Sequence, residues 1–95
     1  MRQYELVLMI DPEADQERVD AVIERVRKIA NDHGGEIVSE NNWGKRKLAY
    51  KIGSHTEANY HLTNIRMEND GTKVLENNLK LADDVIRHLL VRTED

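Results

Sequence analysis

The 95-residue chain contains no cysteine, no phenylalanine and only one proline. Without cysteine, disulfides and zinc–thiolate sites are excluded. Small secreted domains usually depend on such cross-links, so a cytoplasmic setting is favoured. Long apolar runs are missing too: the stretch from Leu6 to Ile10 is too short to cross a bilayer, and no cleavage-site pattern follows it. A hydrophobic core must therefore come from Val, Ile, Leu and Met, with three Tyr and one Trp.

The length is sufficient for one domain and too small for two with separate cores, so we expect a single domain over residues 1–95. No linker, repeat or low-complexity segment divides the chain. Charged residues make up 34% of the sequence, which is high for a compact domain and predicts a strongly ionic surface.

Charge is distributed unevenly along the chain. The formal net charge is −4, yet residues 41–56 carry +4 and no acidic group, so the remainder carries −8. A basic segment on an acidic body can dock an anion on one side, while the rest of the surface repels polyanions. The four basic residues of the segment are Lys45, Arg46, Lys47 and Lys51.

Apolar spacing predicts six elements. Helix 15–32 should begin at Asp15 as its N-cap and end before Gly34 and Gly35. The long strand 36–52 changes parity in its middle, and a bulge at Gly44 would reconcile the two halves. Strand 59–67 also changes parity, without an obvious residue to cause it. The other predicted elements are strand 3–10, a turn over 53–58, helix 72–81 and strand 85–92.

The order βαββαβ predicts an α+β fold of the ferredoxin-like class. We expect a four-stranded antiparallel sheet in which the first and third strands are central and the second and fourth are edges. Both helices should cover one face, which leaves the other face for a partner. This fold serves many unrelated activities and does not by itself identify a function.

The basic segment has two interpretations. Lys45, Lys47 and Lys51 alternate, so they should line one face of the second strand, and edge strands commonly carry lysine to prevent unwanted pairing. Alternatively, these side chains contact phosphates, and the flanking Trp43 and Tyr50 stack on bases. The spacing alone leaves both interpretations open.

Catalysis and metal binding find no support in the sequence. The four histidines show no metal-ligand spacing, and no serine or carboxylate pair has the context of a nucleophile or an acid–base pair. We therefore expect no enzyme activity, no metal and no cofactor. An RNA recognition motif shares the topology, but its third strand should be rich in aromatics, and here that strand has only Tyr60.

Three stretches resemble the bacterial small-subunit ribosomal protein S6 family. They are Met1–Glu5, the decapeptide WGKRKLAYKI at residues 43–52, and the last strand with its end at residues 85–93. They occur in the expected order and together span almost the whole chain. The resemblance implies a non-enzymatic constituent of the small ribosomal subunit that binds the central domain, or platform, of small-subunit ribosomal RNA together with ribosomal protein S18.

The resemblance also implies site residues. The implied partner edge is the second strand around Tyr50, Lys51 and Ile52, although the family often has proline where this chain has Lys51. It further implies a cytoplasmic, ribosomal location. The rival interpretation is a stand-alone ferredoxin-like regulatory or ligand-binding module that dimerises through its sheet. The implied RNA-binding residues are Arg2, Tyr4, Lys45, Arg46, Lys47, Arg87 and Arg92.

Overall fold

The computed structural model describes residues 1–93, so the last two residues of the expected domain lie outside the description. The element order is βαββαβ, as the sequence predicts. None of the helices within residues 1–93 is long and apolar enough to cross a membrane. The elements are β1 (Arg2–Ile10), α1 (Gln16–Asp32), β2 (Glu36–Ile52), β3 (His55–Met67), α2 (Gly71–Leu81) and β4 (Val85–Arg92).

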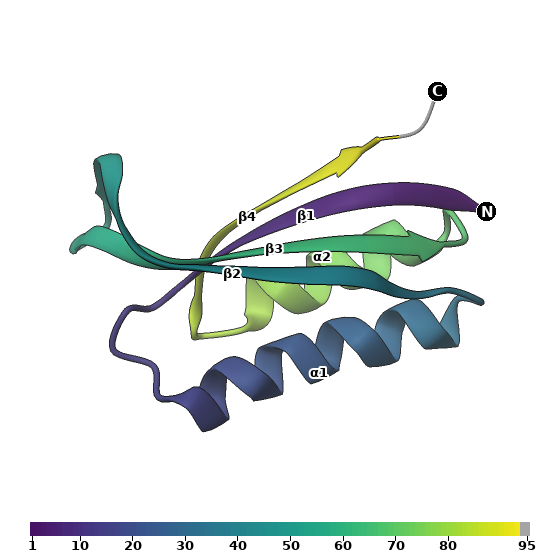
Figure 1. Ribbon diagram of the computed structural model, residues 1–95, viewed down its shortest axis with the longest axis horizontal. Coiled ribbons are helices and arrows are strands. Elements are labelled where there is room, and N and C mark those ends of the chain that lie inside the picture. The colour runs from purple at the N-terminus through teal and green to yellow at the C-terminus, as the bar shows by residue number, and fades with distance from the viewer. Residues whose placement is uncertain (94–95) are drawn as a thin grey trace.

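The four strands form one antiparallel sheet in the order β2-β3-β1-β4. Strands β1 and β3 are central, and β2 and β4 are the two edges. Both helices cover the same face, and the opposite face, called the open face below, carries no helix (Figure 1). This arrangement confirms the predicted ferredoxin-like α+β fold.

The core lies between the sheet and the two helices. Strand β1 alternates strictly, and its core-facing side chains from Tyr4 to Ile10 are at most 4% exposed. Helix α1 contributes an apolar stripe that runs from Val19 to Ala30, and α2 contributes Leu75 and Leu79. Burial of this apolar surface is the main force that holds the layers together.

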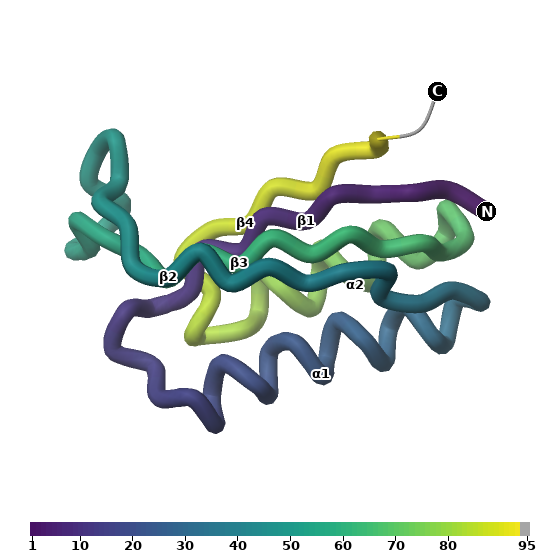
Figure 2. The backbone as a smooth tube through the Cα atoms, viewed as in Figure 1, coloured from purple at the N-terminus to yellow at the C-terminus, as the bar shows by residue number. Residues whose placement is uncertain are grey.

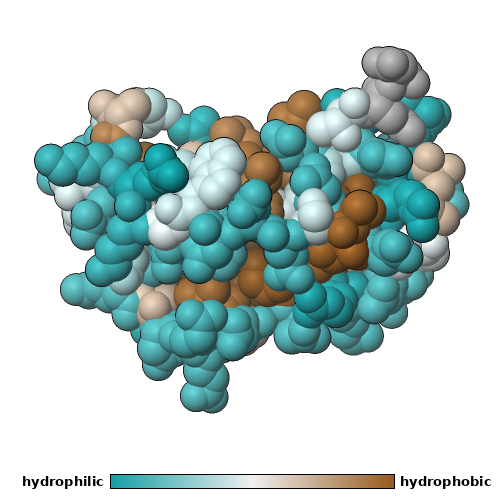
Figure 3. Space-filling view, in the orientation of Figure 1, coloured by the Kyte–Doolittle hydropathy of each residue, from teal (hydrophilic) through white to brown (hydrophobic). Residues whose placement is uncertain are grey.

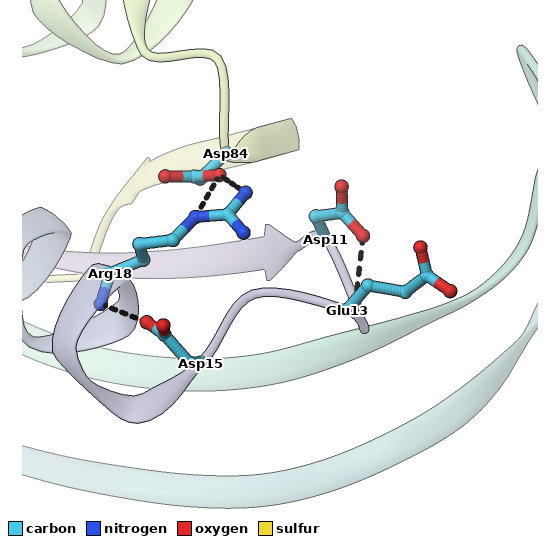
Figure 4. Close-up of polar contacts among 5 residues, drawn as sticks. All are labelled: Asp11, Glu13, Asp15, Arg18 and Asp84. Atoms are coloured by element: carbon cyan, nitrogen blue, oxygen red, sulfur yellow. Dashed lines mark hydrogen bonds and ion pairs between the residues drawn. The ribbon is translucent and has the colours of Figure 1, made fainter.

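The start of α1 is fixed by its own first turn and by the chain before β4. The backbone N–H of Arg18 donates to the Asp15 carboxylate at 2.9 Å, which confirms Asp15 as the N-cap. The Arg18 guanidinium reaches across to Asp84 and hydrogen-bonds it (Figure 4). This contact raises the pKa of Arg18 and ties the start of α1 to the start of β4.

The hairpin between β2 and β3 is longer than the sequence predicts. Strand β3 begins at His55, so the expected turn over residues 53–58 is wrong: Gly53, at φ 60°, and Ser54 alone reverse the chain. Polar residues lie within this strand, where Glu57 pairs with Lys47 and His55 with Ile52, because an exposed antiparallel strand does not need apolar side chains. The outer hairpin extends past the sheet and curls toward the open face (Figure 2).

Strand β2 contains the predicted bulge and two further irregularities. Its register against β3 shifts between Asn42 and Gly44, and Gly44 has φ 76°, which confirms the bulge at this glycine. The Gly44 N–H donates to the Asn42 side chain at 2.8 Å. The register also shifts near residues 37–39 and again between Lys47 and Ile52. No glycine marks these two shifts, and neither of them was predicted.

The parity change in β3 has a simple cause. From His61 to Met67 the strand alternates regularly, and its core-facing positions include the polar residues His61 and Thr63. Tyr60 and Leu62 lie on the open face, where they are half-buried. The apolar residues therefore switch from the open face to the core face along β3, because the polar residues His61 and Thr63 occupy two of the core-facing positions.

Candidate nucleic-acid interface

The residues implied as RNA contacts fall into two groups at opposite ends of the sheet. Arg92 lies opposite Tyr4 in the β1–β4 pairing, and Arg2 is at the same end. Arg87 lies opposite Met9, at the end from which the hairpin projects. The strand rows through Tyr4 and Met9 are five residues apart, which corresponds to roughly 17 Å along β1.

The outer part of the β2–β3 hairpin, residues 43–56, is called the basic hairpin below. Lys45 and Lys47 lie opposite Asn59 and Glu57, two residues apart along β2, so they share a face. Lys45 also lines a hollow beside Asp11 and the first turn after β1. The register shift before Ile52 interrupts the alternation that would continue this row to Lys51.

Trp43 and Arg46 form an exposed aromatic–cation pair at the start of the basic hairpin. The Arg46 guanidinium carbon lies 5.7 Å from the centroid of the Trp43 ring, and Trp43 is 43% exposed. The bulge at Gly44 separates the two residues and allows the arginine to approach the ring. An open ring beside a cation offers a base a stacking surface and a phosphate a charge.

Tyr50 and Arg87 connect the basic hairpin to the opposite edge of the sheet. The Arg87 guanidinium donates to the Tyr50 hydroxyl, although the residues are 37 positions apart and belong to the two edge strands. Tyr50 remains 62% exposed. The curl of the hairpin therefore places a partner-edge residue beside a residue implied to bind RNA.

Tyr4 differs from the other implied RNA contacts. Its side chain belongs to the core, at 4% exposure, and its hydroxyl donates to the Asn69 side chain at 3.0 Å. A ring packed in the core has no free face for a base, so we leave Tyr4 out of the interface proposed below. The even spacing from Tyr4 to Ile10 is the signal that indicates this structural role.

The open face carries apolar side chains that the sequence analysis did not assign. Leu62, Val7 and Leu89 lie side by side across β3, β1 and β4. Leu89 and the nearby Val91 are 42% and 55% exposed. Apolar residues on both faces of β1 and β4 are the sequence feature that could have predicted this apolar patch. The view in Figure 3 shows a mostly polar surface broken by apolar side chains.

The histidines do not combine into a site. His33 lies 3.3 Å from Asp70 and His88 lies 3.8 Å from Glu76, so each has its own carboxylate neighbour. His61 is buried on the core side of β3. Within residues 1–93, no three His, Cys, Asp or Glu side chains are close enough together to hold a metal ion.

The element order and the sheet topology define a small domain of the ferredoxin-like class. Residues 3–92 match the family described as Ribosomal protein S6. The small ribosomal subunit protein bS6 of Clostridioides difficile is 42% identical over 96% of this chain and 98% of its own length. The same protein of Carboxydothermus hydrogenoformans is 34% identical over 99% of this chain and 98% of its own length.

A solved structure agrees with these sequence relatives. The crystal structure of 30S ribosomal protein S6 from Thermotoga maritima superimposes with a TM-score of 0.87 and 30% identity, and covers 97% of this chain and 87% of that one. The chain therefore belongs to the ribosomal protein S6 family. It is a ribosomal protein and not an enzyme.

Proposed function

We propose that this protein is a structural constituent of the small ribosomal subunit that binds the central domain of small-subunit ribosomal RNA together with ribosomal protein S18. The observation that supports this proposal most is the exposed basic hairpin on a chain of the S6 family. Relatives are named as small-subunit proteins. The corresponding location is the cytoplasmic ribosome.

The proposed RNA surface consists of the basic hairpin with Arg87, and of Arg2 and Arg92 at the opposite end of the sheet. Lysine and arginine neutralise phosphates and release counterions, and this supplies affinity without requiring base recognition. The pair formed by Trp43 and Arg46 adds one stacking surface. The net −8 outside residues 41–56 repels a polyanion, so RNA contact should be confined to these basic side chains. The proposed contacts are Arg2, Lys45, Arg46, Lys47, Arg87 and Arg92.

The proposed protein partner uses the edge of β2 around Tyr50, Lys51 and Ile52. Residues 48–51 have no opposite partner on β3. Their backbone N–H and C=O groups can therefore hydrogen-bond a partner protein at the sheet edge. Lys51, where the family often has proline, adds both an N–H donor and a positive charge. The apolar side chains of the open face can extend the contact beyond the edge.

The test compares two double variants. Arg46→Ala with Lys47→Ala removes two charges from the basic hairpin. Lys28→Ala with Lys73→Ala removes the same charge from α1 and α2, which cover the other face of the sheet. All four are surface positions, so each substitution should change the free energy of unfolding by less than about 0.5 kcal/mol. Incorporation into reconstituted small subunits is measured beside a denaturation curve for each variant.

We expect the hairpin variant to incorporate poorly at an unchanged denaturation midpoint, and the helix variant to incorporate like the parent. Equal incorporation of both variants and the parent would reject the basic hairpin as the RNA site. A parent protein that sediments as a free dimer after lysis, rather than with small subunits, would favour the stand-alone module that dimerises through its sheet.

A further inference from the structure

A side-chain contact joins the outer end of the basic hairpin to a distant element of the fold. The Arg87 guanidinium donates to the Tyr50 hydroxyl at 2.5 Å. Arg87 lies on β4 and Tyr50 on β2, which are the two edges of the sheet, so the contact is made past β3 and β1. The contact agrees with the path of the hairpin, which curls toward the open face (Figure 2).

Ladder hydrogen bonds alone hold this region weakly. Lys47 still has an opposite residue on β3, and the next pair is Ile52 with His55, directly before the turn. Residues 48–51 between them have none. A two-stranded ribbon that projects beyond its sheet, with a gap in its ladder, opens at low cost in free energy. The hydrogen bond to Tyr50 therefore acts in the part of the hairpin that lacks cross-strand pairs.

The chemistry of the contact suits a positional role. A guanidinium forms directional hydrogen bonds through a planar fork, and the phenol hydroxyl accepts one of them. Both side chains are exposed, so the contact adds little to global stability. It does select one orientation of the hairpin, and with it the positions of Lys45, Arg46 and Lys47 relative to the sheet.

We propose that Arg87 is a positioning residue: it holds Tyr50, fixes the basic hairpin over the open face and contributes to RNA binding through this order. The inference rests on the proposed function and deepens it at one residue: Arg87 acts by ordering the basic hairpin and is not itself a phosphate contact. A preorganised hairpin does not lose conformational entropy when it binds, so the contact increases affinity without neutralising a phosphate. Tyr50→Phe should then weaken RNA binding although it removes no charge.

The test combines two measurements on Tyr50→Phe, Arg87→Gln and the double variant. The first is amide hydrogen exchange of residues 43–56 in the free protein. We expect each single variant to speed exchange about three- to ten-fold, as loss of one ordinary hydrogen bond implies, and the double variant to add nothing further. The denaturation midpoint should stay at the parent value. Tyr60→Phe removes the same hydroxyl from β3 and should leave hairpin exchange unchanged.

The second measurement is the affinity of each variant, with the S18 partner, for a platform RNA fragment at several salt concentrations. We expect Tyr50→Phe and Arg87→Gln to weaken binding by a similar factor while the log–log salt slope stays at the parent value. Arg46→Ala, as a matched control, should reduce the magnitude of the slope by about 1 and leave hairpin exchange unchanged.

Two results would overturn the inference. One is parent-like hairpin exchange in Tyr50→Phe. The other is an Arg87→Gln variant with a reduced salt slope beside a Tyr50→Phe variant of full affinity, which would make Arg87 a direct phosphate contact. A parent protein that does not bind the RNA fragment would reject the proposed function instead, and the exchange measurement would still decide whether the contact orders the hairpin.

Discussion

His61 occupies a core position that most proteins give to an apolar side chain. It is 8% exposed, it lies opposite Leu8 in the sheet, and its Nε2 atom has no hydrogen-bond partner in the structure. The Oγ1 atom of Thr63, on the same face of β3, also has none. Burial lowers the pKa of His61, while the negative charges of Glu40 and Asp20 oppose the shift. Two polar groups therefore reduce the stability of the core.

This burial predicts a pH dependence of stability. Because the folded pKa of His61 is lowered, the unfolded chain binds more protons, so stability is full above the unfolded value of about 6.5 and falls as the pH drops below it. His61→Leu should raise the free energy of unfolding by about 1 kcal/mol at pH 7 and flatten this fall. Denaturant unfolding between pH 5 and 8 measures both effects. A variant with the same pH profile as the parent would contradict the assignment to His61.

Single residues also show where inference from sequence succeeds. The even apolar spacing of β1 predicted its core face correctly, since every second residue there is buried. The same reasoning could not place His61 or Thr63 inside, because a polar side chain gives no periodic signal for burial. Tyr4 was assigned to RNA through family resemblance, although its spacing already matched the core residues Leu6 and Leu8.

At the scale of elements, the N-cap of α1 can be tested directly. The Asp15 carboxylate accepts from the Arg18 N–H at 2.9 Å and satisfies a backbone donor that the helix leaves open. Asp15→Ala should lower the free energy of unfolding by about 1 kcal/mol. Asp15→Asn retains an acceptor and should cost much less. Thermal unfolding of both variants separates capping from loss of charge, and equal losses would favour charge.

Gly35 and Gly44 are required for different reasons, and alanine substitutions at the two positions should differ in their cost to the free energy of unfolding. A Cβ on Gly35 would lie 1.6 Å from the carbonyl oxygen of Arg66, a backbone atom of β3 that cannot move aside. A Cβ on Gly44 would meet nothing within 4 Å, so only its left-handed backbone, at φ 76°, resists a side chain. Gly35→Ala should therefore cost about 3 kcal/mol or more, and Gly44→Ala about 1–2 kcal/mol.

Denaturant midpoints of the two variants, measured beside the parent, test this order. A milder loss for Gly35→Ala than for Gly44→Ala would contradict the close approach of β2 to β3 at Arg66. The contrast also shows what sequence can reveal about glycine. A bulge at Gly44 could be predicted from the parity change, whereas the crowding at Gly35 depends on a strand more than 30 residues away.

Element boundaries were predictable where apolar periodicity was strong. The range of β4 agrees with the sequence prediction, and α1 follows its predicted N-cap. The error at the start of β3 arose because Thr56 and Glu57 give no apolar alternation, although Glu57 and His55 both pair with residues of β2. Exposed hairpins of this kind are specified by their turn, here at Gly53, more than by side-chain burial.

At the scale of the whole molecule, the sheet order followed from connectivity rules, but the curl of the basic hairpin did not. Sequence order and handedness leave few arrangements for βαββαβ, and the observed one has β1 and β3 in the centre. Strand β2 has three register shifts, of which only the one at Gly44 was predicted, and the curl of the hairpin was not predicted either. The contact of Tyr50 with Arg87 follows from this curvature, so no reading of the sequence could anticipate it.

The charge asymmetry of the molecule predicts the salt dependence of RNA binding. Outside residues 41–56 the chain carries a net −8, so the proposed phosphate contacts are limited to the basic hairpin and the three arginines of β1 and β4. With roughly four to six such contacts, the logarithm of affinity should fall with the logarithm of salt with a slope of about −3 to −5. Titration of the protein with the proposed S18 partner on an RNA fragment measures the slope.

The slope distinguishes charge neutralisation from apolar docking. If the open face around Val7 and Leu89 supplied most of the affinity, salt would have little effect, because burial of apolar surface releases no counterions. Leu89→Ser should then weaken binding to RNA as strongly as Arg46→Ala does. On the charge-based proposal Leu89→Ser leaves the slope at the parent value and Arg46→Ala reduces its magnitude by about 1. A parent slope near zero would reject the electrostatic account of this surface.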